Sequence, residues 1–375
     1  MIRLSKTIVG EQEISAVKSV MEVGYLGMGQ ETQRFEQDLV DYIGGDNRHV
    51  VCVNSGTAAL HLALQAIGVG VGDEVLVPSL TFVASFQPIS AIGAVPVACD
   101  VCESNALLDL ADAEKRITSR TKAIMPVHYA SYPGNLQAIY EFAKKHNLRV
   151  VEDAAHAFGC VYKDKRIGSF GDVVCFSFDG IKNITSGEGG AVVSSDMDVI
   201  QRVQDARLLG VEKDSDNRYK GQRSWEFDVN EQGYRYHMSD IMAAIGRVQL
   251  QRFEKEFKPK RQQLASYYRQ LLSGVSGIKL FETDLDHVVS HILPIRVLND
   301  KRDGVRKRLL ENNIQSGIHY KPNHLLSKYG GGEVSLPVSE QLYLELLSLP
   351  LHPGLTKLDI DRIVNVIKNI CGEKT

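Results

Sequence analysis

Lys182 stands where an apolar run, Phe-Ser-Phe at residues 176–178, gives way to a glycine-rich stretch that ends at Gly190. A lysine at the end of a predicted apolar strand is uncommon, because removing water from an ammonium group costs free energy. The same desolvation lowers the pKa of the amine and makes it a nucleophile toward carbonyl groups. The segment therefore predicts a lysine that binds a Schiff-base cofactor.

A carboxylate ends a second apolar run. Asp153 closes the predicted strand Arg149–Asp153, at the edge where open α/β sheets place their ligands. A buried carboxylate there needs a positive partner, and a protonated pyridine nitrogen would serve as one. The alternative is that Asp153 caps a following helix, and the carboxylate alone leaves both interpretations open.

The segment Ser55-Gly-Thr-Ala-Ala59 follows the predicted strand His49–Val53 and opens a helix. Free N–H groups and the helix dipole favour a phosphate at such a position, and the Thr57 hydroxyl adds a donor. Serine and threonine are also ordinary N-caps, so a purely capping role is the alternative. The chain contains neither GxGxxG nor GxxxxGK[ST], which argues against a dinucleotide-binding fold and a P-loop.

Two further strand ends carry aromatic groups. Phe82 follows the predicted strand Glu74–Pro78 and has the shape to stack on a flat ring, although a lone phenylalanine is more often a core residue. His128 and Tyr129 stand at the end of the predicted strand Ala123–His128. All these strand ends are expected on one rim of a sheet, and their conjunction is stronger evidence for a site than any single member.

The elements that must position these groups alternate in type. Residues 1–250 alternate short Val/Ile-rich runs with amphipathic helical patterns, which indicates a large α/β domain. Several runs are continuously apolar, as expected for strands covered on both faces. The predicted strands are His49–Val53, Glu74–Pro78, Val95–Asp100, Ala123–His128, Arg149–Asp153, Val173–Phe178 and Gly190–Ser194.

Residues 251–375 are expected to form a small α+β domain. The charged segment 252–261 continues a long helix from about Ser239 and predicts a solvated connector at the domain boundary. Beyond it, residues 277–297 are typical of strands, and residues 304–313 and 358–370 of helices.

Composition limits the functional classes. The chain has 375 residues, 43% hydrophobic and 24% charged, which is an ordinary soluble balance. A net charge of −3 gives no basic field for nucleic acid or a membrane surface. With no signal-peptide pattern at the N-terminus and no apolar run long enough to span a bilayer, we expect a cytoplasmic protein. The six scattered cysteines predict reduced, buried thiols rather than disulfides, and Cys99-x-x-Cys102 lacks the second pair or the histidines that a metal site needs.

Over nearly its whole length the chain resembles the DegT/DnrJ/StrS family of sugar aminotransferases, which use pyridoxal 5′-phosphate (PLP). The resemblance implies a PLP-dependent transferase fold of type I, like that of aspartate aminotransferase, with a mostly parallel large-domain sheet. It also implies a homodimer whose active sites are shared between subunits. The motifs that carry it are Leu4-Ser-Lys, Gly24-Tyr-Leu-Gly-Met-Gly29, Ser55-Gly-Thr-Ala-Ala59, Pro78-Ser-Leu-Thr-Phe-Val-Ala84, Glu152-Asp-Ala-Ala-His156, residues 176–190, His319-Tyr-Lys-Pro322 and Leu347-Ser-Leu-Pro-Leu-His-Pro353.

By motif match, Lys182 would be the Schiff-base lysine and Asp153 the partner of the pyridinium nitrogen. His156 would bind the ring hydroxyl and Phe82 would stack on the ring. The resemblance assigns the cofactor phosphate to Thr57, Ala58 and Ser177.

Three positions depart from the family pattern. Arg235 replaces an asparagine that reaches the partner's cofactor phosphate, and His237 replaces an arginine. A guanidinium at residue 235 can still bind phosphate, as a charged donor. Ser131 stands where relatives often have glycine, in a segment expected to shape the sugar pocket.

The resemblance implies transfer of an amino group from glutamate to a keto-deoxysugar on a nucleotide diphosphate, with a 4-keto-6-deoxy sugar as the favoured substrate. The product would be an amino sugar for a surface polysaccharide, such as a lipopolysaccharide O-antigen, or for a glycosylated natural product. The expected substrate contacts are His128, Tyr129, His237, His319 and Tyr320.

Amination of a 3-keto sugar or of a cyclitol (inosose) is the alternative within the same chemistry. A sugar dehydratase on this scaffold would carry histidine in place of Lys182, so the lysine argues against it. A non-catalytic PLP-binding regulator would need an added DNA-binding domain, for which the chain has neither spare length nor basic charge. A plain nucleotide-binding module would leave Lys182 and Asp153 unexplained.

Overall fold

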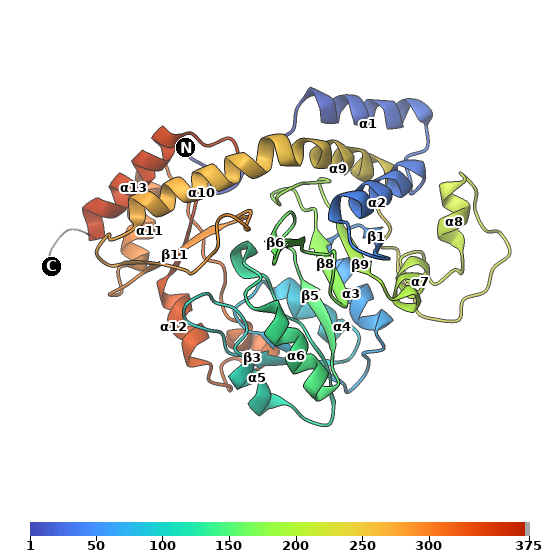
Figure 1. The fold of residues 1–375 in the computed structure, drawn as a ribbon, viewed down its shortest axis with the longest axis horizontal. Helices are drawn as coiled ribbons and strands as arrows, with labels where there is room; N and C mark the ends of the chain where they lie inside the picture. The colour runs from blue at the N-terminus through green and yellow to red at the C-terminus, as the bar shows by residue number, and fades with distance from the viewer. Residues whose placement is uncertain (372–375) are drawn as a thin grey trace.

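A computed structural model describes residues 1–371 and contains one seven-stranded sheet at its centre (Figure 1). The strand order is β1-β9-β8-β5-β4-β2-β3. β9 is antiparallel to both of its neighbours, and the other six strands run in one direction. The strands are β1 His49–Val53, β2 Glu74–Pro78, β3 Val95–Cys99, β4 Thr121–Ile124, β5 Arg149–Asp153, β8 Val173–Ser177 and β9 Gly190–Ser194.

The predicted strands of the large sheet are present, and interior strands such as β8 bury their apolar side chains on both faces, whereas the edge strand β3 is partly exposed. In β8, Val173 and Cys175 pack in the core on one side of the sheet, whereas Val174 and Phe176 pack on the other. Side chains alternate between faces along a strand, so a strand covered on both sides needs a continuous apolar run. This is the physical reason why the sequence pattern located the strands.

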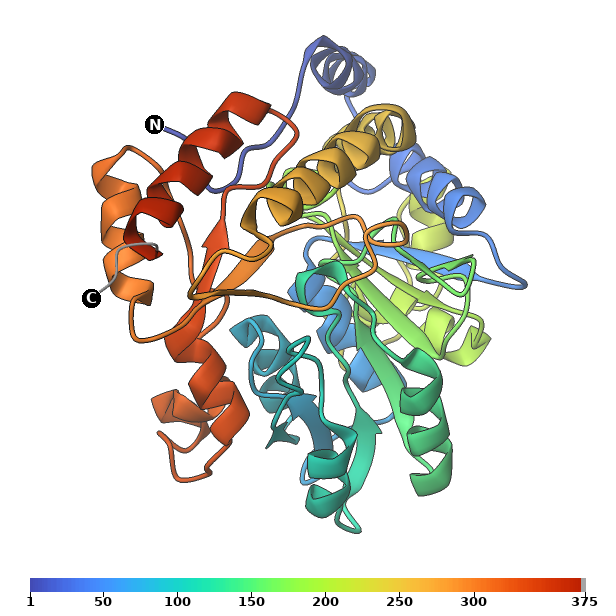
Figure 2. The same ribbon diagram turned by 60° about the vertical axis from the view of Figure 1, so that its left-hand side comes forward.

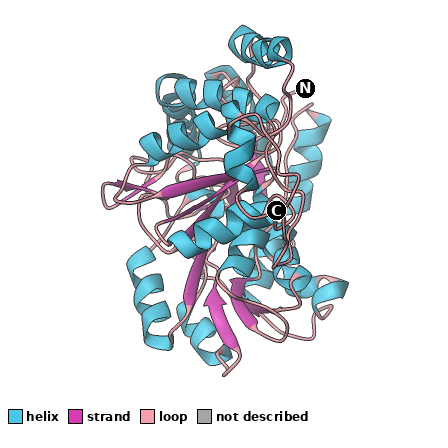
Figure 3. Ribbon diagram, turned by 90° about the vertical axis from the view of Figure 1, so that its right-hand side faces the viewer, coloured by secondary structure: helices cyan, strands magenta, loops and turns pink. Residues whose placement is uncertain are grey.

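Helices cover both faces of the sheet (Figure 3). One core contains side chains of α3 (Gly56–Ala66), α4 (Gln87–Ala91) and α7 (Met197–Ala206). The core on the other face contains side chains of α2 (Gln30–Ile43) and α9 (Asp240–Arg252). The remaining helices of this region are α1 Glu11–Val23, α5 Leu110–Arg116, α6 Leu136–His146 and α8 Asp214–Tyr219.

A long helix links the large sheet to the C-terminal part of the chain. α9 continues through a π-helical turn, Phe253–Phe257, into α10, Lys258–Leu272, and the whole helix extends across the molecule toward α13 (Figure 1). The charged segment predicted as a helical connector is therefore helical.

The C-terminal part contains a second, three-stranded antiparallel sheet of order β10-β11-β12, seen beside the large sheet in Figure 2. Its own core joins side chains of α10, α11 and α13 to those of β11 and β12. The elements here are β10 Ile278–Leu280, β11 Leu293–Val297, α11 Arg302–Glu311, α12 Pro337–Glu345, β12 Leu346–Leu349 and α13 Lys357–Cys371.

Short elements complete the fold. β6 Val161–Tyr162 and β7 Lys165–Arg166 pair as a small hairpin. Short 3₁₀ turns follow the carboxyl ends of β2 and β4 and precede α12, at Val83–Ser85, Tyr129–Ser131, Asn323–Leu325 and Ser327–Tyr329.

Some expected boundaries differ from those observed. β4 ends at Ile124 rather than at His128, because Pro126 has no N–H to give to a neighbouring strand, and beyond it a single bridge joins Val127 to Asp153. Residues 281–292, inside the region expected to be strands, connect β10 to β11 without strand structure.

The division at residue 250 stays a prediction, and residues 372–375 of the proposed small domain lie outside the described residues. Ile2 packs in the C-terminal core, whereas Val288 and Val289 pack in the core of the large sheet. Among the described helices, none is long and apolar enough to cross a membrane.

Candidate active site

A cavity of about 350 Å³ opens at the carboxyl ends of the parallel strands. It receives side chains that follow β1, β2, β5 and β8, because parallel strands end at the same edge of a sheet. The structure brings eight of the predicted site residues to this cavity, namely Thr57, Phe82, Asp153, His156, Ser177, Lys182, His319 and Tyr320.

Lys182 lies in the turn after β8, where its backbone N–H donates to the Asp179 carbonyl at 3.0 Å. Burial lowers the pKa of the Lys182 amine, and the nearby carboxylates Asp179 and Asp153 act in the opposite direction. The Nζ atom lies 3.5 Å from Nε2 of His291. The lysine is thus partly buried in the cavity with an amine that loses its proton more readily than an exposed lysine.

Asp153 ends β5 and accepts hydrogen bonds at both carboxylate oxygens. Ser85 Oγ donates to Oδ2 at 2.7 Å and the Ala155 N–H donates to Oδ1 at 3.2 Å. The backbone after Asp153 turns without forming a helix, so the carboxylate does not cap one. A carboxylate has about four lone-pair positions, which leaves capacity for a cationic ligand in the cavity.

The N-terminus of α3 forms a polar corner of the cavity. Ser55 is the N-cap, and its Oγ accepts the Ala58 N–H at 3.1 Å. The Ala58 N–H is thus bonded to the cap, whereas the N–H groups of Gly56 and Thr57 have no partner within the helix. The corner is tight, because a Cβ on Gly56 would lie 2.8 Å from Cβ of Ser177.

Two histidines and a tyrosine face the amine of Lys182. Burial and the nearby Lys182 hold the pKa of His156 well below its usual value and lower that of His319 to about 4. The Tyr320 hydroxyl lies 3.2 Å from His156 Nε2, and burial raises the pKa of that hydroxyl. At neutral pH the three side chains are therefore neutral.

Phe82 lies at the mouth of the cavity. Its side chain is 56% exposed, and its ring centroid is 5.5 Å from that of Tyr320. A phenylalanine left this open is not a core residue of the described chain, which leaves a face for a flat ring.

His128 and Tyr129 are buried behind the cavity wall. Nε2 of His128 lies 2.8 Å from Oε2 of Glu152, and the Tyr129 hydroxyl donates to the His319 carbonyl. His128 thus contacts the neighbour of Asp153, Tyr129 contacts the cavity residue His319, and neither lines the cavity itself.

Arg235 and His237 line a different cavity, of about 200 Å³, together with Arg218 and Trp225. Burial and neighbouring arginines lower the pKa of His237 to about 4. The Asn54 side chain donates to the Arg235 carbonyl at 3.5 Å, so this segment lies beside the end of β1. The structure of the single chain does not bring their side chains to Lys182.

Two polar side chains of the site were not predicted from the sequence. Ser85 follows the motif at residues 78–84 and supports Asp153, whereas His291 precedes β11 and approaches Lys182 from the C-terminal part. Ser85 stands one residue past a motif that was identified. Nothing in the local pattern around His291 links it to Lys182.

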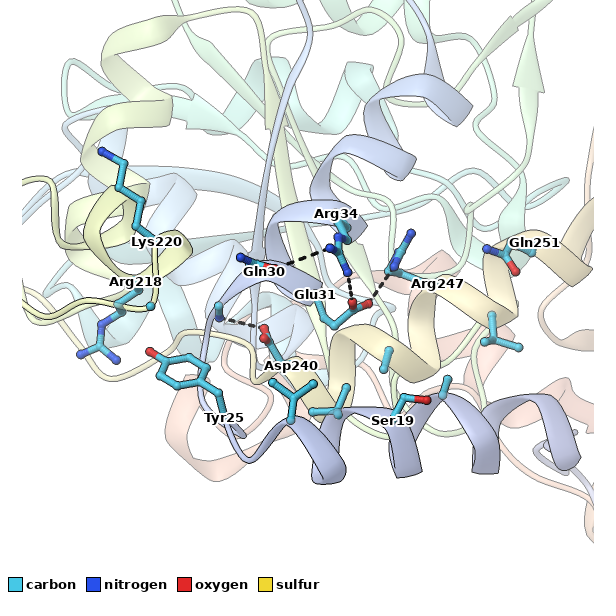
Figure 4. Close-up of a pocket in the computed structure, with 17 residues that line it drawn as sticks. Ser19, Tyr25, Gln30, Glu31, Arg34, Arg218, Lys220, Asp240, Arg247 and Gln251 are labelled. Atoms are coloured by element: carbon cyan, nitrogen blue, oxygen red, sulfur yellow. Dashed lines mark hydrogen bonds and ion pairs between the residues drawn. The ribbon is translucent and has the colours of Figure 1, made fainter.

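A larger cavity, of about 580 Å³, lies between α1, α2 and α9 (Figure 4). The Glu31 carboxylate there accepts from both Arg34 and Arg247, and Asp240 accepts from the Gly29 N–H. Its two carboxylates are thus already paired within the protein, and Lys220 stands apart from both of them (Figure 4).

The residues of the smaller cavity fit PLP by their donor chemistry. An amine of lowered pKa, a carboxylate with spare acceptor capacity and the N–H groups of a helix N-terminus match the aldehyde, the pyridine nitrogen and the phosphate. In addition, Nδ1 of His156 is buried and has no hydrogen-bond partner in the part of the chain that the structure describes.

Comparisons with known proteins agree with this chemistry. A model of the DegT/DnrJ/EryC1/StrS aminotransferase family matches residues 7–368. The chain is 38% identical over 387 residues to UDP-4-amino-4-deoxy-L-arabinose–oxoglutarate aminotransferase of Shewanella sediminis, covering 99% of this chain and 98% of the relative. It is 35% identical over 376 residues to the spore coat polysaccharide biosynthesis protein SpsC of Bacillus subtilis, covering 98% and 96%. The PLP-form structure of Spr1654 from Streptococcus pneumoniae matches with a TM-score of 0.90 at 30% identity, covering 98% of each chain.

Proposed function

Because the chain belongs to the DegT/DnrJ/EryC1/StrS aminotransferase family and is thus a PLP-dependent aminotransferase, we propose that it transfers an amino group from glutamate to a nucleotide-diphosphate-linked keto-deoxysugar. The favoured substrate is a 4-keto-6-deoxy sugar. The observation that carries the proposal is the amine of Lys182, held in a cavity with Asp153 and with its pKa lowered by burial. The name of the Shewanella relative, which describes a 4-amino sugar on a nucleotide, supports amination at C4.

Lys182 would bind the cofactor's aldehyde and Asp153 would pair with its ring nitrogen. PLP supplies an electron sink for the carbanion that forms at the amine-bearing carbon. Thr57, Ala58 and Ser177 would hold the phosphate at the N-terminus of α3. His156 would bind the ring hydroxyl, and Phe82, open at the mouth, would cover one face of the ring.

Proton transfer is the main task left to the protein. The group that moves the proton must be neutral to take it and cationic to return it. Lys182 can do both more readily than an exposed lysine because its pKa is lowered, whereas burial keeps His156 and His319 neutral. We therefore assign the transfer between amino donor and sugar to Lys182 alone.

His319 and Tyr320 line the cavity from the C-terminal part and are the proposed contacts for the sugar. Tyr129 would act through His319, whose carbonyl accepts from its hydroxyl, and His128 through Glu152, the neighbour of Asp153 in β5.

A homodimer with shared active sites is part of the proposal. Trp225 is 84% exposed and Phe227 60% exposed, and both stand beside Arg235 and His237. Covering these rings with a second copy would remove apolar surface from water. It would also give Arg235 a position from which to bind the partner's cofactor phosphate and His237 one near the partner's substrate. We place the enzyme in the cytoplasm, making amino sugars for polysaccharides or glycosides.

The proposal is tested by incubating the PLP-loaded protein with glutamate and a panel of nucleotide-linked 3-keto and 4-keto sugars. Mass spectrometry should detect an amino sugar and 2-oxoglutarate from a 4-keto substrate, and none with the Lys182→Ala variant. Amination of 3-keto sugars or of a keto-cyclitol alone would contradict the assigned substrate.

A further inference from the structure

His291 is a buried polar side chain close to Lys182 to which the proposed reaction gives no role. The residue lies two positions before the first residue of β11, and its Nε2 atom lies 3.5 Å from Nζ of Lys182. The ring is 4% exposed and its centroid lies 4.6 Å from that of His156. Among the described residues its Nδ1 atom has no hydrogen-bond partner. The position of this buried imidazole is therefore fixed by packing within the protein.

Ser131 holds the backbone of His291. The His291 N–H donates to Ser131 Oγ at 2.8 Å, and the same hydroxyl donates to the His156 carbonyl. Ser131 is fully buried, so water does not compete for these two hydrogen bonds. One hydroxyl thus ties together the two segments that carry the neighbouring imidazoles.

The backbone of Ser131 makes this hydroxyl more informative. Its φ is +77°, in the left-handed region that a residue with a Cβ rarely adopts and that glycine adopts freely. A serine here costs local strain that a glycine would avoid. The two hydrogen bonds of the hydroxyl offset that cost, and a glycine cannot make them. These hydrogen bonds explain why a serine stands at this position.

A second pair of contacts fixes the same segment next to Lys182. Asn183, the residue after the lysine, donates through Nδ2 to the Val289 carbonyl at 2.9 Å and to the Phe158 carbonyl at 3.1 Å. The Val289 N–H donates to Sγ of Cys160 at 3.2 Å. The separation of Lys182 and His291 is therefore set by bonds on both sides of the pair.

The charges around His291 keep its ring neutral. The groups that face it are Lys182, His156, His319 and Arg261. Burial and these groups hold the pKa of His291 well below the usual value. Arg261 is itself buried and donates to carbonyls, including that of His291, at 3.3 Å. A neutral ring can turn a bare Nε2 to Lys182 and accept a hydrogen bond from its ammonium form.

We propose that Ser131 and His291 are positioning residues for Lys182, in which the serine hydroxyl fixes the backbone of His291 and the imidazole accepts a hydrogen bond from the lysine ammonium. The ammonium is then held in one orientation in the cavity, and its pKa stays higher than burial alone would leave it. The inference rests on the proposed catalytic role of Lys182.

The test measures the pKa of Lys182 in the full-length protein freed of PLP. Labelling with acetic anhydride over a range of pH, with mass spectrometry of the peptide that contains Lys182, gives this value without turnover. His291→Leu should lower the pKa of Lys182 by about one unit, because a hydrogen bond to a charged donor is lost. His291→Gln places an amide oxygen close to the position of Nε2 and should restore most of the shift.

Comparing Ser131→Ala with Ser131→Gly distinguishes the effect of losing the hydroxyl from the effect of relieving the backbone strain. Both remove the two hydrogen bonds, and the glycine variant also relieves the strained backbone, which protects it from failing to fold. Both should lower the pKa of Lys182 in the same direction as His291→Leu, by about half as much. In the His291→Leu background neither should add a further shift, because the two residues act in series.

Ser186→Ala is the matched control. Ser186 is also buried, and its Oγ has no hydrogen-bond partner within residues 1–371. Its loss should leave the pKa of Lys182 unchanged. A pKa of Lys182 that is the same in wild type, His291→Leu and Ser131→Gly would overturn the proposal.

Turnover separates this inference from the function it rests on. With PLP and substrates, His291→Leu should lower kcat about tenfold and leave KM for the sugar within about twofold, because the change acts on proton transfer and not on binding. If the shifts occur and Lys182→Ala still turns over, the proposed function fails while the positioning holds. If Lys182 proves essential and the shifts are absent, the positioning fails alone.

Discussion

Two cavities of the molecule, one between α1, α2 and α9 and one at the strand ends, differ in how their polar groups are paired. In the larger one, between α1, α2 and α9, the carboxylates are already bonded to arginines and to backbone N–H groups (Figure 4). In the smaller one, at the strand ends, Lys182 is held with a lowered pKa and His156 keeps a buried ring nitrogen without a partner in the described chain. The carboxylates of the larger cavity are therefore paired within the protein, whereas the smaller cavity keeps polar atoms that a ligand can bind.

This difference teaches that volume does not locate the chemistry. A polar group that is buried without a hydrogen-bond partner destabilises the folded protein. A fold tolerates this cost where a ligand supplies the missing partner. The smaller cavity has a volume of about 350 Å³ and the larger one about 580 Å³. The smaller cavity nevertheless contains the groups that can bind an aldehyde, a cation and an anion.

Lys182→Ala should have the largest effect and so test the comparison most severely. Loss of the amine removes both the covalent contact to PLP and the proton carrier, so kcat should fall by about 10⁴-fold or more in an assay of amino sugar formation. Lys220→Ala, at the rim of the larger cavity, is the control and should stay within about twofold of wild type. Comparable losses in the two variants would erase the distinction between the cavities.

Asp153→Asn should have the second largest effect. The amide keeps the shape and the bond from Ser85 but no longer stabilises a protonated ring nitrogen, so kcat should fall by about 10²-fold while PLP stays bound. Absorbance of bound PLP after gel filtration checks retention of the cofactor. A wild-type kcat in this variant would reduce the carboxylate to a structural acceptor.

The pH dependence of stability provides a test without substrates. Lys182 has a lower pKa in the folded chain than the ordinary 10.5, so between the two values the unfolded chain binds more protons and the free energy of unfolding rises with pH. The cost of the buried ammonium is therefore fully present below the folded pKa and disappears as the pH passes 10.5. In the PLP-free protein, Lys182→Met should raise the free energy of unfolding at pH 7 by roughly 1 kcal/mol.

Urea unfolding of both proteins at several pH values measures this difference. The increase in the free energy of unfolding that Lys182→Met causes should shrink as the pH rises toward the pKa of a free lysine side chain. A variant that is less stable than wild type at pH 7 would mean that the ammonium is well paired in the folded chain.

Arg247→Ala should have the smallest effect on activity. The guanidinium bonds Glu31 and Asp38 at 2.7 Å each and is partly exposed, so its loss should lower the free energy of unfolding by about 0.5–1 kcal/mol. The value of kcat/KM should stay within about twofold of wild type when the oligomeric state is unchanged. A tenfold loss at constant stability and oligomeric state would give the larger cavity a part in the reaction.

The strands and the rim residues could be predicted from the sequence for one physical reason. Strands buried on both faces need continuous apolar runs, and parallel strands bring their carboxyl ends to one edge. Asp153 ends such a run, and Thr57 and Lys182 lie in the segments that follow β1 and β8, so the three meet at the cavity. The family resemblance then supplied the cofactor and the fold type, which the family match and the solved relatives confirm.

His291 could not be predicted in this way, because it is 109 residues from Lys182 and reaches it through packing of the C-terminal part. The end of β4 was misplaced because the apolar pattern continues past Pro126, whose missing N–H ends the regular ladder and leaves a single bridge from Val127 to Asp153. The left-handed backbone at Ser131 could not be predicted from the residue type, because serine usually avoids that conformation.

The central claim is that PLP binds covalently at Lys182, in the smaller cavity. Borohydride treatment of the PLP-loaded protein fixes the cofactor to whichever lysine holds it, and peptide mass mapping then identifies that residue. The claim predicts the pyridoxyl mass on the peptide that contains Lys182. The same mass on the peptide that contains Lys220, in the larger cavity, with Lys182 unmodified, would contradict it.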